Sequence, residues 1–201
     1  SGSAGGIVGL GTRLTMTAID SRGSIIAGGG QGVGGVVGTV SDSAISQCSS
    51  HVDIDSDSHS VGGIAGSVDD SDVRQCQANG DVIGVVNVGG LVGSGSGLIV
   101  SDSQSYGNVT GSSNVGGAVG LMNQRSRLQL GVVAEGAVTA TGNYAGGLVG
   151  IVLRASQVDS SYALGDVVGQ DFVGGLVGSI NWWESAYTGS RNRVSLSLIH
   201  I

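Results

Sequence analysis

Apolar and polar residues alternate in short segments that glycines separate. In residues 158–169 the small or apolar positions fall two apart, with polar positions between them. A two-residue period is typical of β-strands, whose successive side chains point to opposite faces. No stretch has a convincing helical stripe. Residues 121–130 come nearest to one, and we interpret them as a decorated loop because they contain Arg125 and Arg127.

A six-residue phrase recurs along the chain. Its clearest copies are residues 88–93 and 173–178, which read Val-Gly-Gly-Leu-Val-Gly in both places. Successive copies lie 27 to 30 residues apart, and a fixed period in this range predicts a repeat architecture. The first glycine of the phrase falls at Gly5, Gly34, Gly62, Gly89, Gly116, Gly146 and Gly174.

Alignment on a second phrase, shared by residues 73–84, 100–111 and 158–169, gives columns of equivalent positions. We expect equivalent residues to stack about 4.8 Å apart, as neighbouring parallel strands do. One column is always β-branched: Ile25, Ile54, Val82, Val109, Val138 and Val167. Another is always small: Ser21, Ser50, Ala78, Ser105, Ala134 and Ala163. A third reads as outward-facing: Ser24, Asp53, Asp81, Asn108, Ala137 and Asp166.

These patterns predict an all-β repeat solenoid, a parallel β-helix with about 28 residues per coil. We assign residues 1–178 to the solenoid and residues 179–195 to a degenerate last coil or an end cover. Glycines are expected to form the turns, because they reach positive φ without strain. The glycine in sixth place of the phrase never varies, so it needs either positive φ or the absence of a Cβ.

Composition narrows the picture. The 201 residues include 40 glycines and no proline, and only 3% are aromatic, so the core must consist of small and β-branched side chains. The formal net charge is −7, and the eight basic residues, all arginines, form no dense run. We therefore expect no nucleic-acid partner. No run of about 18 apolar residues predicts a membrane span.

The two ends of the sequence differ from the repeats. The chain starts inside a repeat, so we interpret it as a fragment whose export signal could lie upstream. Residues 196–201 do not continue the pattern and resemble the translation of a sequencing adapter. We expect this tail to be non-native.

The Val-Gly-Gly-Leu-Val-Gly phrase, followed by Ser-Tyr-Ala-x-Gly-x-Val-x-Gly, resembles the GLUG repeat over about residues 4–178. GLUG repeats belong to large exported bacterial surface proteins, such as filamentous haemagglutinin-like adhesins and the flanking regions of immunoglobulin A peptidases. The resemblance implies an extracellular or cell-surface location and no catalytic residues or cofactors. It also implies further repeats of the same chain as neighbours, and a surface glycan or protein as the partner.

Two cysteines and four carboxylates are the candidate chemical groups. Cys48 and Cys76 share one column in adjacent coils, so they are candidates for a disulfide. The alternative is two buried small residues. Asp53, Asp55, Asp57 and Asp81 would gather on one side and could bind Ca²⁺, but a solvated acidic face is the simpler interpretation. We predict no metal site. Serine, histidine and aspartate are present, but nothing singles out a nucleophile.

Three aromatic residues follow the last copy of the phrase: Trp182, Trp183 and Tyr187. They could cover the open end of the stack or face a ligand. The function that the sequence favours is a non-catalytic structural or adhesive segment of a surface protein. The alternatives are a polysaccharide-acting β-helix enzyme and a carbohydrate-binding module.

Overall fold

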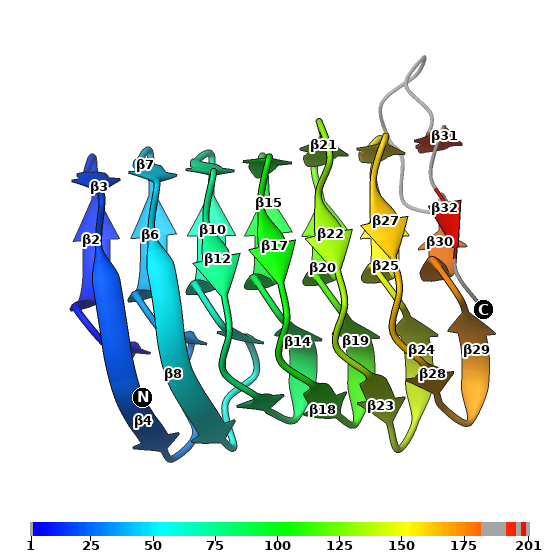
Figure 1. Cartoon of the computed structure of the whole chain (residues 1–201), viewed down its shortest axis with the longest axis horizontal. Coiled ribbons are helices and arrows are strands. Elements are labelled where there is room, and N and C mark those ends of the chain that lie inside the picture. The colour runs from blue at the N-terminus through cyan, green and yellow to red at the C-terminus, as the bar shows by residue number, and fades with distance from the viewer. Residues whose placement is uncertain (1, 182–191, 196–197, 200–201) are drawn as a thin grey trace.

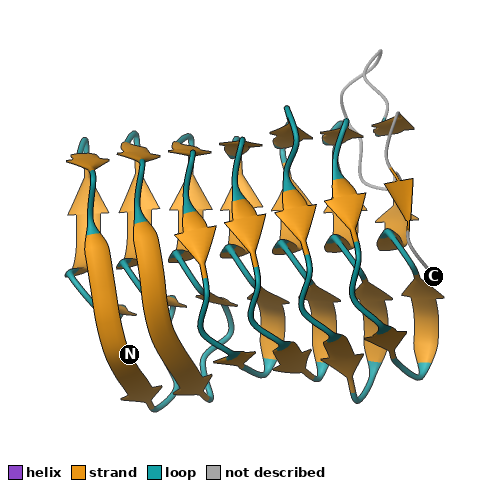
Figure 2. Ribbon diagram, viewed as in Figure 1, coloured by secondary structure: helices purple, strands orange, loops and turns teal. Residues whose placement is uncertain are grey.

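The computed structural model describes residues 2–181, 192–195 and 198–199. It is a parallel β-solenoid of about 6 turns with about 28 residues per turn, which confirms the predicted fold class. The coils stack along the long axis of the molecule from the N-terminal to the C-terminal end (Figure 1). The described residues form strands and short connections, without a helix (Figure 2).

Four parallel sheets run the length of the stack. Sheet A consists of β1 (Ala4–Gly5), β5 (Val33–Gly34), β9 (Val61–Gly62), β14 (Val86–Gly89), β19 (Ser113–Gly116), β24 (Asn143–Gly146) and β29 (Asp171–Gly174). Sheet B consists of β2 (Val8–Thr12), β6 (Val37–Ser41), β10 (Ala65–Asp69), β15 (Val92–Ser96), β20 (Val119–Asn123), β25 (Val149–Leu153) and β30 (Val177–Asn181).

Sheet C has only three-residue strands. They are β3 (Thr15–Thr17), β7 (Ala44–Ser46), β11 (Asp72–Arg74), β16 (Ile99–Ser101), β21 (Arg127–Gln129), β26 (Gln157–Asp159) and β31 (Arg193–Ser195). Residues 121–130 therefore contribute to β20 and β21, and our interpretation of them as a loop is wrong except for the short turn between these strands. Sheet C forms the upper edge of the molecule in Figure 1.

Sheet D divides part of the way along the solenoid. It starts with two eight-residue strands, β4 (Asp20–Ala27) and β8 (Ser49–Ser56). Strand β8 then pairs with two shorter strands, and both branches continue toward the C-terminal end. One branch is β12 (Gln77–Ala78), β17 (Gln104–Ser105), β22 (Val133–Ala134), β27 (Tyr162–Ala163) and β32 (Leu198–Ile199). The other is β13 (Val82–Ile83), β18 (Val109–Gly111), β23 (Val138–Ala140) and β28 (Val167–Val168).

Each of coils 1 to 6 contains one strand from each of sheets A, B and C, together with one long strand of sheet D or, from coil 3 onward, both of its branches. Coil 1 comprises β1–β4, coil 2 β5–β8, coil 3 β9–β13, coil 4 β14–β18, coil 5 β19–β23 and coil 6 β24–β28. Strands β29–β32 are the described part of coil 7, so the described residues of 179–195 continue sheets B and C. Of the tail at 196–201 the structure describes only β32, which lies beside β27.

The columns found in the sequence are the pairing register of the sheets. Every first glycine of the phrase faces the next along sheet A, from Gly5 opposite Gly34 to Gly146 opposite Gly174. The β-branched column pairs in order from Ile25 to Val167 along sheet D. The small column does the same from Ser21 to Ala163.

The coils enclose two apolar cores instead of one. The larger core lies between sheets B and C and the first half of sheet D, and includes Ile45, Leu91 and Leu128. The smaller core lies between sheet A and the second half of sheet D, and includes Val61, Ile54 and Val109. The β-branched column belongs to this smaller core.

The two cores meet at a waist where the backbone comes closest to itself. The second glycine of each phrase faces the small column: a Cβ on Gly90 would collide with Ser105 Oγ, and a Cβ on Gly117 would lie 2.8 Å from Ala134 Cβ. Larger side chains in the small column would force these backbones apart. The waist therefore explains why the column contains only Ser and Ala.

The sixth glycine of the phrase is required by close packing and not by φ. Among the described glycines only Gly23, Gly97 and Gly131 have positive φ, and none of them is the sixth glycine. A Cβ on Gly93 would lie 2.6 Å from Gly66 O and 2.8 Å from Asn87 O. These atoms belong to the backbones of sheets A and B, which meet at this position without side chains between them.

The expectation that glycines make the turns is wrong. Among the described residues, most of those with positive φ are not glycine, and many of them stack in columns at the corners of the coil. The corner between sheets C and D has Ala18, Gln47, Gln75, Asp102, Leu130 and Ser160, all with φ between 47° and 58°. Glycines lie instead where two backbones are in contact. The turns are formed by non-glycine residues, which bear the strain of a positive φ.

Candidate functional site

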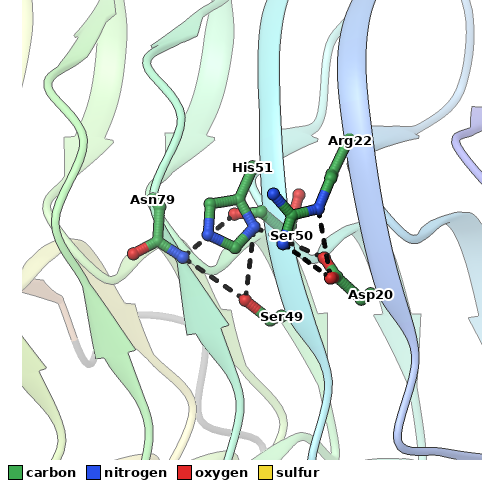
Figure 3. Close-up of polar contacts among 6 residues, drawn as sticks. All are labelled: Asp20, Arg22, Ser49, Ser50, His51 and Asn79. Atoms are coloured by element: carbon green, nitrogen blue, oxygen red, sulfur yellow. Dashed lines mark hydrogen bonds and ion pairs between the residues drawn. The ribbon is translucent and has the colours of Figure 1, made fainter.

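A polar cluster lies on the outer face of sheet D in coils 1 to 3. It consists of Asp20 and Arg22 on β4, Ser49 and His51 on β8, and Asn79 just after β12 (Figure 3). These residues alternate with the inward-facing small column, so the strand period points them to solvent. Asp20 is in register with Ser49, and Arg22 with His51. Stacking therefore brings their side chains together across two coils.

Hydrogen bonds and ion pairs connect the cluster. Arg22 donates from Nε and Nη2 to Asp20 Oδ2, at 3.1 and 2.8 Å. The hydrogen bond from Arg22 holds the pKa of Asp20 below its usual value, and His51 acts in the same direction. His51 Nδ1 lies 3.4 Å from the other carboxylate oxygen, Oδ1. Asn79 Nδ2 donates to Ser49 Oγ at 3.4 Å.

Ser49, His51 and Asp20 are the residue types of a hydrolytic triad, but their arrangement is different. In a triad the carboxylate holds one ring nitrogen and the serine contacts the other. Here Ser49 Oγ lies 3.5 Å from His51 Nδ1, the same nitrogen that faces Asp20. His51 cannot accept the serine proton on one side while the carboxylate orients it from the other. The cluster thus forms an exposed ion-pair network without an activated nucleophile.

This cluster was not predicted from the sequence. The signal was present, because Asp20 and Ser49 each precede a residue of the small column by one position. Alignment of the outward positions alone would have placed the side chains of Asp20, Ser49 and His51 together. Repeated serines masked the signal, since only their neighbours distinguish one serine from the next.

Two of the four carboxylates considered as metal ligands, Asp53 and Asp81, bond to backbone amides of the next coil. Asp53 Oδ1 accepts the N–H of Asp81 at 3.0 Å, and Asp81 Oδ1 accepts the N–H of Asn108 at 2.8 Å. Asn108 Oδ1 continues the series with the N–H of Ala137 at 3.1 Å. Asp55 and Asp57 are exposed at the far end of β8 and beyond it. Within the described residues, no three His, Cys, Asp or Glu side chains are grouped so that they could hold a metal ion.

Cys48 and Cys76 are buried free thiols in adjacent coils. Hydrogen bonding to Cys48, together with burial, raises the pKa of Cys76, while the same hydrogen bond lowers the pKa of Cys48 to about 7. Each sulfur also lies 3.2 Å from the carbonyl oxygen two residues earlier in the chain. The two sulfurs therefore lie in contact with each other as free thiols, and a disulfide between them stays a prediction. Thiol titration of the unfolded, unreduced protein tests it.

The aromatic residues proposed as ligand-facing, Trp182, Trp183 and Tyr187, lie outside the described residues. A different aromatic pair lies close to the C-terminal end. Tyr144 and Phe172 occupy the left-handed position of sheet A in coils 6 and 7, and their rings stack with centroids 5.0 Å apart. The two rings stack on each other in the same column as Asn87 and Asn114, whose side-chain amides are hydrogen-bonded to each other.

Comparison with known proteins identifies the repeat. The family model described as "The GLUG motif" matches residues 57–83, which run from the connection after β8 through all five strands of coil 3. No curated protein and no solved structure matches the chain. The matched segment includes the phrase at residues 61–66, and the other copies of that phrase stack on it in register. As the sequence predicts, the chain contains the GLUG motif.

Proposed function

We propose that the chain is a non-catalytic structural segment of an exported bacterial surface protein, a rigid stalk that spaces or presents an adhesive part. The observation that carries this proposal is the unbroken glycine register, which stacks GLUG phrases from Gly5 to Gly174 along one sheet. GLUG motifs are associated with repeat regions of large bacterial surface proteins. That association supports a location outside the cell.

The backbone contacts support a rigid stalk. Sheets A and B meet through glycines without intervening side chains, so bending there would break direct backbone contacts. Each coil is bound to the next by parallel pairing in all four sheets. Since each coil contacts mainly its neighbours, length grows by adding coils and not by enlarging the core.

The exposed polar groups also favour a non-catalytic role. His51 faces Ser49 and Asp20 through one nitrogen, and Asp53 and Asp81 are occupied by backbone amides. A polysaccharide lyase or hydrolase would need an acid and a base converging on one point.

The described residues contain no helix that could span a membrane.

Three measurements test the proposal. Antibodies against the chain should label intact cells that produce the whole protein, and external protease should remove the label. The purified chain should release no reducing ends from a panel of polysaccharides. Cleavage of any polysaccharide that His51→Ala abolishes would contradict the non-catalytic role, and label confined to broken cells would contradict export.

The same chain applied to a glycan array separates a stalk from a direct binding surface. A stalk should bind no glycan above the level of an unrelated solenoid of similar charge. Reproducible binding to one glycan class would assign adhesion to this segment itself.

A further inference from the structure

Charge is segregated along one edge of the solenoid. We define the B–C edge as the turns between sheets B and C together with the outward side chains of sheet C. In coils 2 and 3 aspartates outnumber arginines there, coil 4 places no charged residue between Ser96 and Ser101, and in coils 5 and 6 arginines outnumber aspartates. Coils 2 and 3 carry Asp42, Asp69, Asp70 and Asp72 beside Arg74, coils 5 and 6 carry Arg125, Arg127 and Arg154 beside Asp159, and coil 1 carries Arg13.

The pairing register puts these opposite charges at equivalent positions. Asp72 of coil 3, Ile99 of coil 4 and Arg127 of coil 5 follow each other along sheet C. In the turns, like charges stack on each other within each half of the edge: Asp42 donates its N–H to Asp69 O, and Arg125 donates its N–H to Arg154 O. The sign of the charge therefore reverses about coil 4, with the half-buried Ile99 at the midpoint.

The acidic half of this edge is hollowed. A shallow groove of about 550 Å³ runs across coils 1 to 4, and its lining includes three aspartates, Asp42, Asp70 and Asp72, together with Arg13, Gly97 and Ile99. Asp42 and Asp70 are exposed at its rim. Gly97 leaves room beside Asp70, since a Cβ there would collide with Asp70 Oδ1. A guanidinium group fits such an acidic groove, because its donors pair with two carboxylate oxygens at once.

From this arrangement we propose that a second copy of the chain docks on the B–C edge in the antiparallel direction. A two-fold axis lies between the two copies and runs parallel to β16. It relates coil 3 of one copy to coil 5 of the other, and coil 2 to coil 6. Asp72 then faces the second copy's Arg127, Asp42 faces its Arg154, and Ile99 faces the second copy's Ile99. Two-fold interfaces of this self-complementary kind are the commonest in homo-oligomers.

The charge pattern indicates which molecule docks on the B–C edge and that it runs antiparallel to the first copy. A parallel neighbour would place aspartates against aspartates, and like charges in contact are disfavoured. A uniformly basic partner would match coils 2 and 3 but meet Arg125 and Arg127 further along. A surface with the opposite order of charges matches coils 2 to 6 of the edge, and the chain itself carries that surface. Asp72 also forms an ion pair with Arg74 of its own chain, with 2.7 Å between Nη2 and Oδ2.

The dimer is weak and sensitive to salt. Exposed ion pairs contribute little individually, and salt screens them within a Debye length of about 10 Å at 0.1 M. Arg125 and Arg154 also have interactions within their own chain. The dimer needs only their charge and position, not their release.

Sedimentation velocity on the full chain tests the dimer. At low salt the chain should form a dimer whose population rises with concentration, and about 0.5 M salt should dissociate it. Asp70→Arg with Asp72→Arg should raise the dimer Kd at least tenfold, as should Arg125→Asp with Arg127→Asp. The four changes combined should restore the Kd to within about threefold. Asp55→Arg with Asp57→Arg makes the same charge change on sheet D and should leave the Kd unchanged.

A cross-link locates the axis independently. Air oxidation of Ile99→Cys should join two chains through a disulfide, two thiols losing two protons and two electrons to oxygen. Thr110→Cys, in the same coil but on sheet D, should not cross-link. A chain that stays monomeric at low salt, a quadruple variant that does not recover, or equal cross-linking at Ile99→Cys and Thr110→Cys would each overturn the proposal. Circular dichroism of every variant confirms that it is folded.

Discussion

At the residue scale, the three glycines of the phrase serve three separate contacts. The first pairs with its equivalents in neighbouring coils along sheet A, and the second faces the small column at the waist. The sixth-place glycine lets the backbones of sheets A and B come into contact. Each contact is made to a neighbouring coil or to another wall of the same coil. A single methyl group would therefore disturb several strands at once.

Gly93→Ala tests the backbone contact. The added Cβ would lie 2.6 Å from Gly66 O and 2.8 Å from Asn87 O, atoms that cannot move without breaking strand pairing. Overpacking of a tight site costs roughly 1–3 kcal/mol and more where backbone must shift, so we expect a loss of at least about 3 kcal/mol. Gly28→Ala is the matched control, because a Cβ there meets nothing within 4 Å. Urea melts that show equal losses for both variants would contradict the close contact.

Ser50→Ala should stabilise the protein. Ser50 Oγ is buried at the waist without a hydrogen-bond partner, and coils 3, 5 and 6 have alanine in the same column. Removing an unsatisfied buried hydroxyl should raise the free energy of unfolding by about 1 kcal/mol.

Ser43→Ala is its opposite control. Ser43 Oγ accepts the N–H of Leu14 at 2.8 Å and donates to Ser41 O at 2.6 Å. Its loss should destabilise by about 1–2 kcal/mol, because the Leu14 amide loses its partner. Thermal melts in which both serine variants change stability in the same direction would contradict the assignment of Ser50 as unpartnered.

At the element scale, the strands are short because the corners of the coil are fixed in place by left-handed residues. Gln47 and Gln75 stack at the corner between sheets C and D, with φ of 55° and 53°. Their amides pair with the carbonyls of the next coil, Gln47 with Arg74 and Gln75 with Ser101. The hydrogen-bond ladder thus continues around the corner, and this holds a non-glycine residue in a conformation it disfavours.

Gln75→Gly should relieve this strain. Left-handed backbone costs a non-glycine residue roughly 1–2 kcal/mol, while glycine loses about 0.5–1 kcal/mol of extra chain entropy on folding. We therefore expect a net gain of up to about 1 kcal/mol in chemical denaturation. Gln77→Gly, two residues later in β12, should lose about 1 kcal/mol, because that position is extended. A loss at both positions would show that the turn imposes no strain.

At the scale of the whole molecule, the sequence predicts the stacking but not the cross-section. Gly5 through Gly174 and Ile25 through Val167 could be aligned because each copy makes the same contact in every coil. Alternation shows which side chains face inward, but not which walls face each other, so two cores were predicted as one. Leu128 explains the error at residues 121–130, because a three-residue strand with one inward side chain has too little pattern to distinguish it from a loop.

The site was only partly predictable for a related reason. The column of Asp53 and Asp81 was identified as outward-facing, but the bonds from its oxygens to the next coil's amides depend on backbone direction. The network of Asp20, Ser49 and His51 depends on register alone and was accessible. The B–C edge required the three-residue strands of sheet C, which the pattern did not reveal.

Removal of one whole coil tests the architecture as a unit. Deleting residues 89–115 joins Val88 to Gly116, and Gly89 and Gly116 are in register, so coil 3 should stack directly on coil 5. Because each coil contacts mainly its neighbours, the shortened chain should fold cooperatively with lower stability. Small-angle scattering should show a rod shorter by about 4.8 Å. Deleting residues 89–101 instead joins sheet A to the corner after sheet C, and this variant should not fold. Equal circular dichroism spectra and melts for the two deletions would mean that coils are not the units of stability, and that stalk length cannot be set by counting repeats.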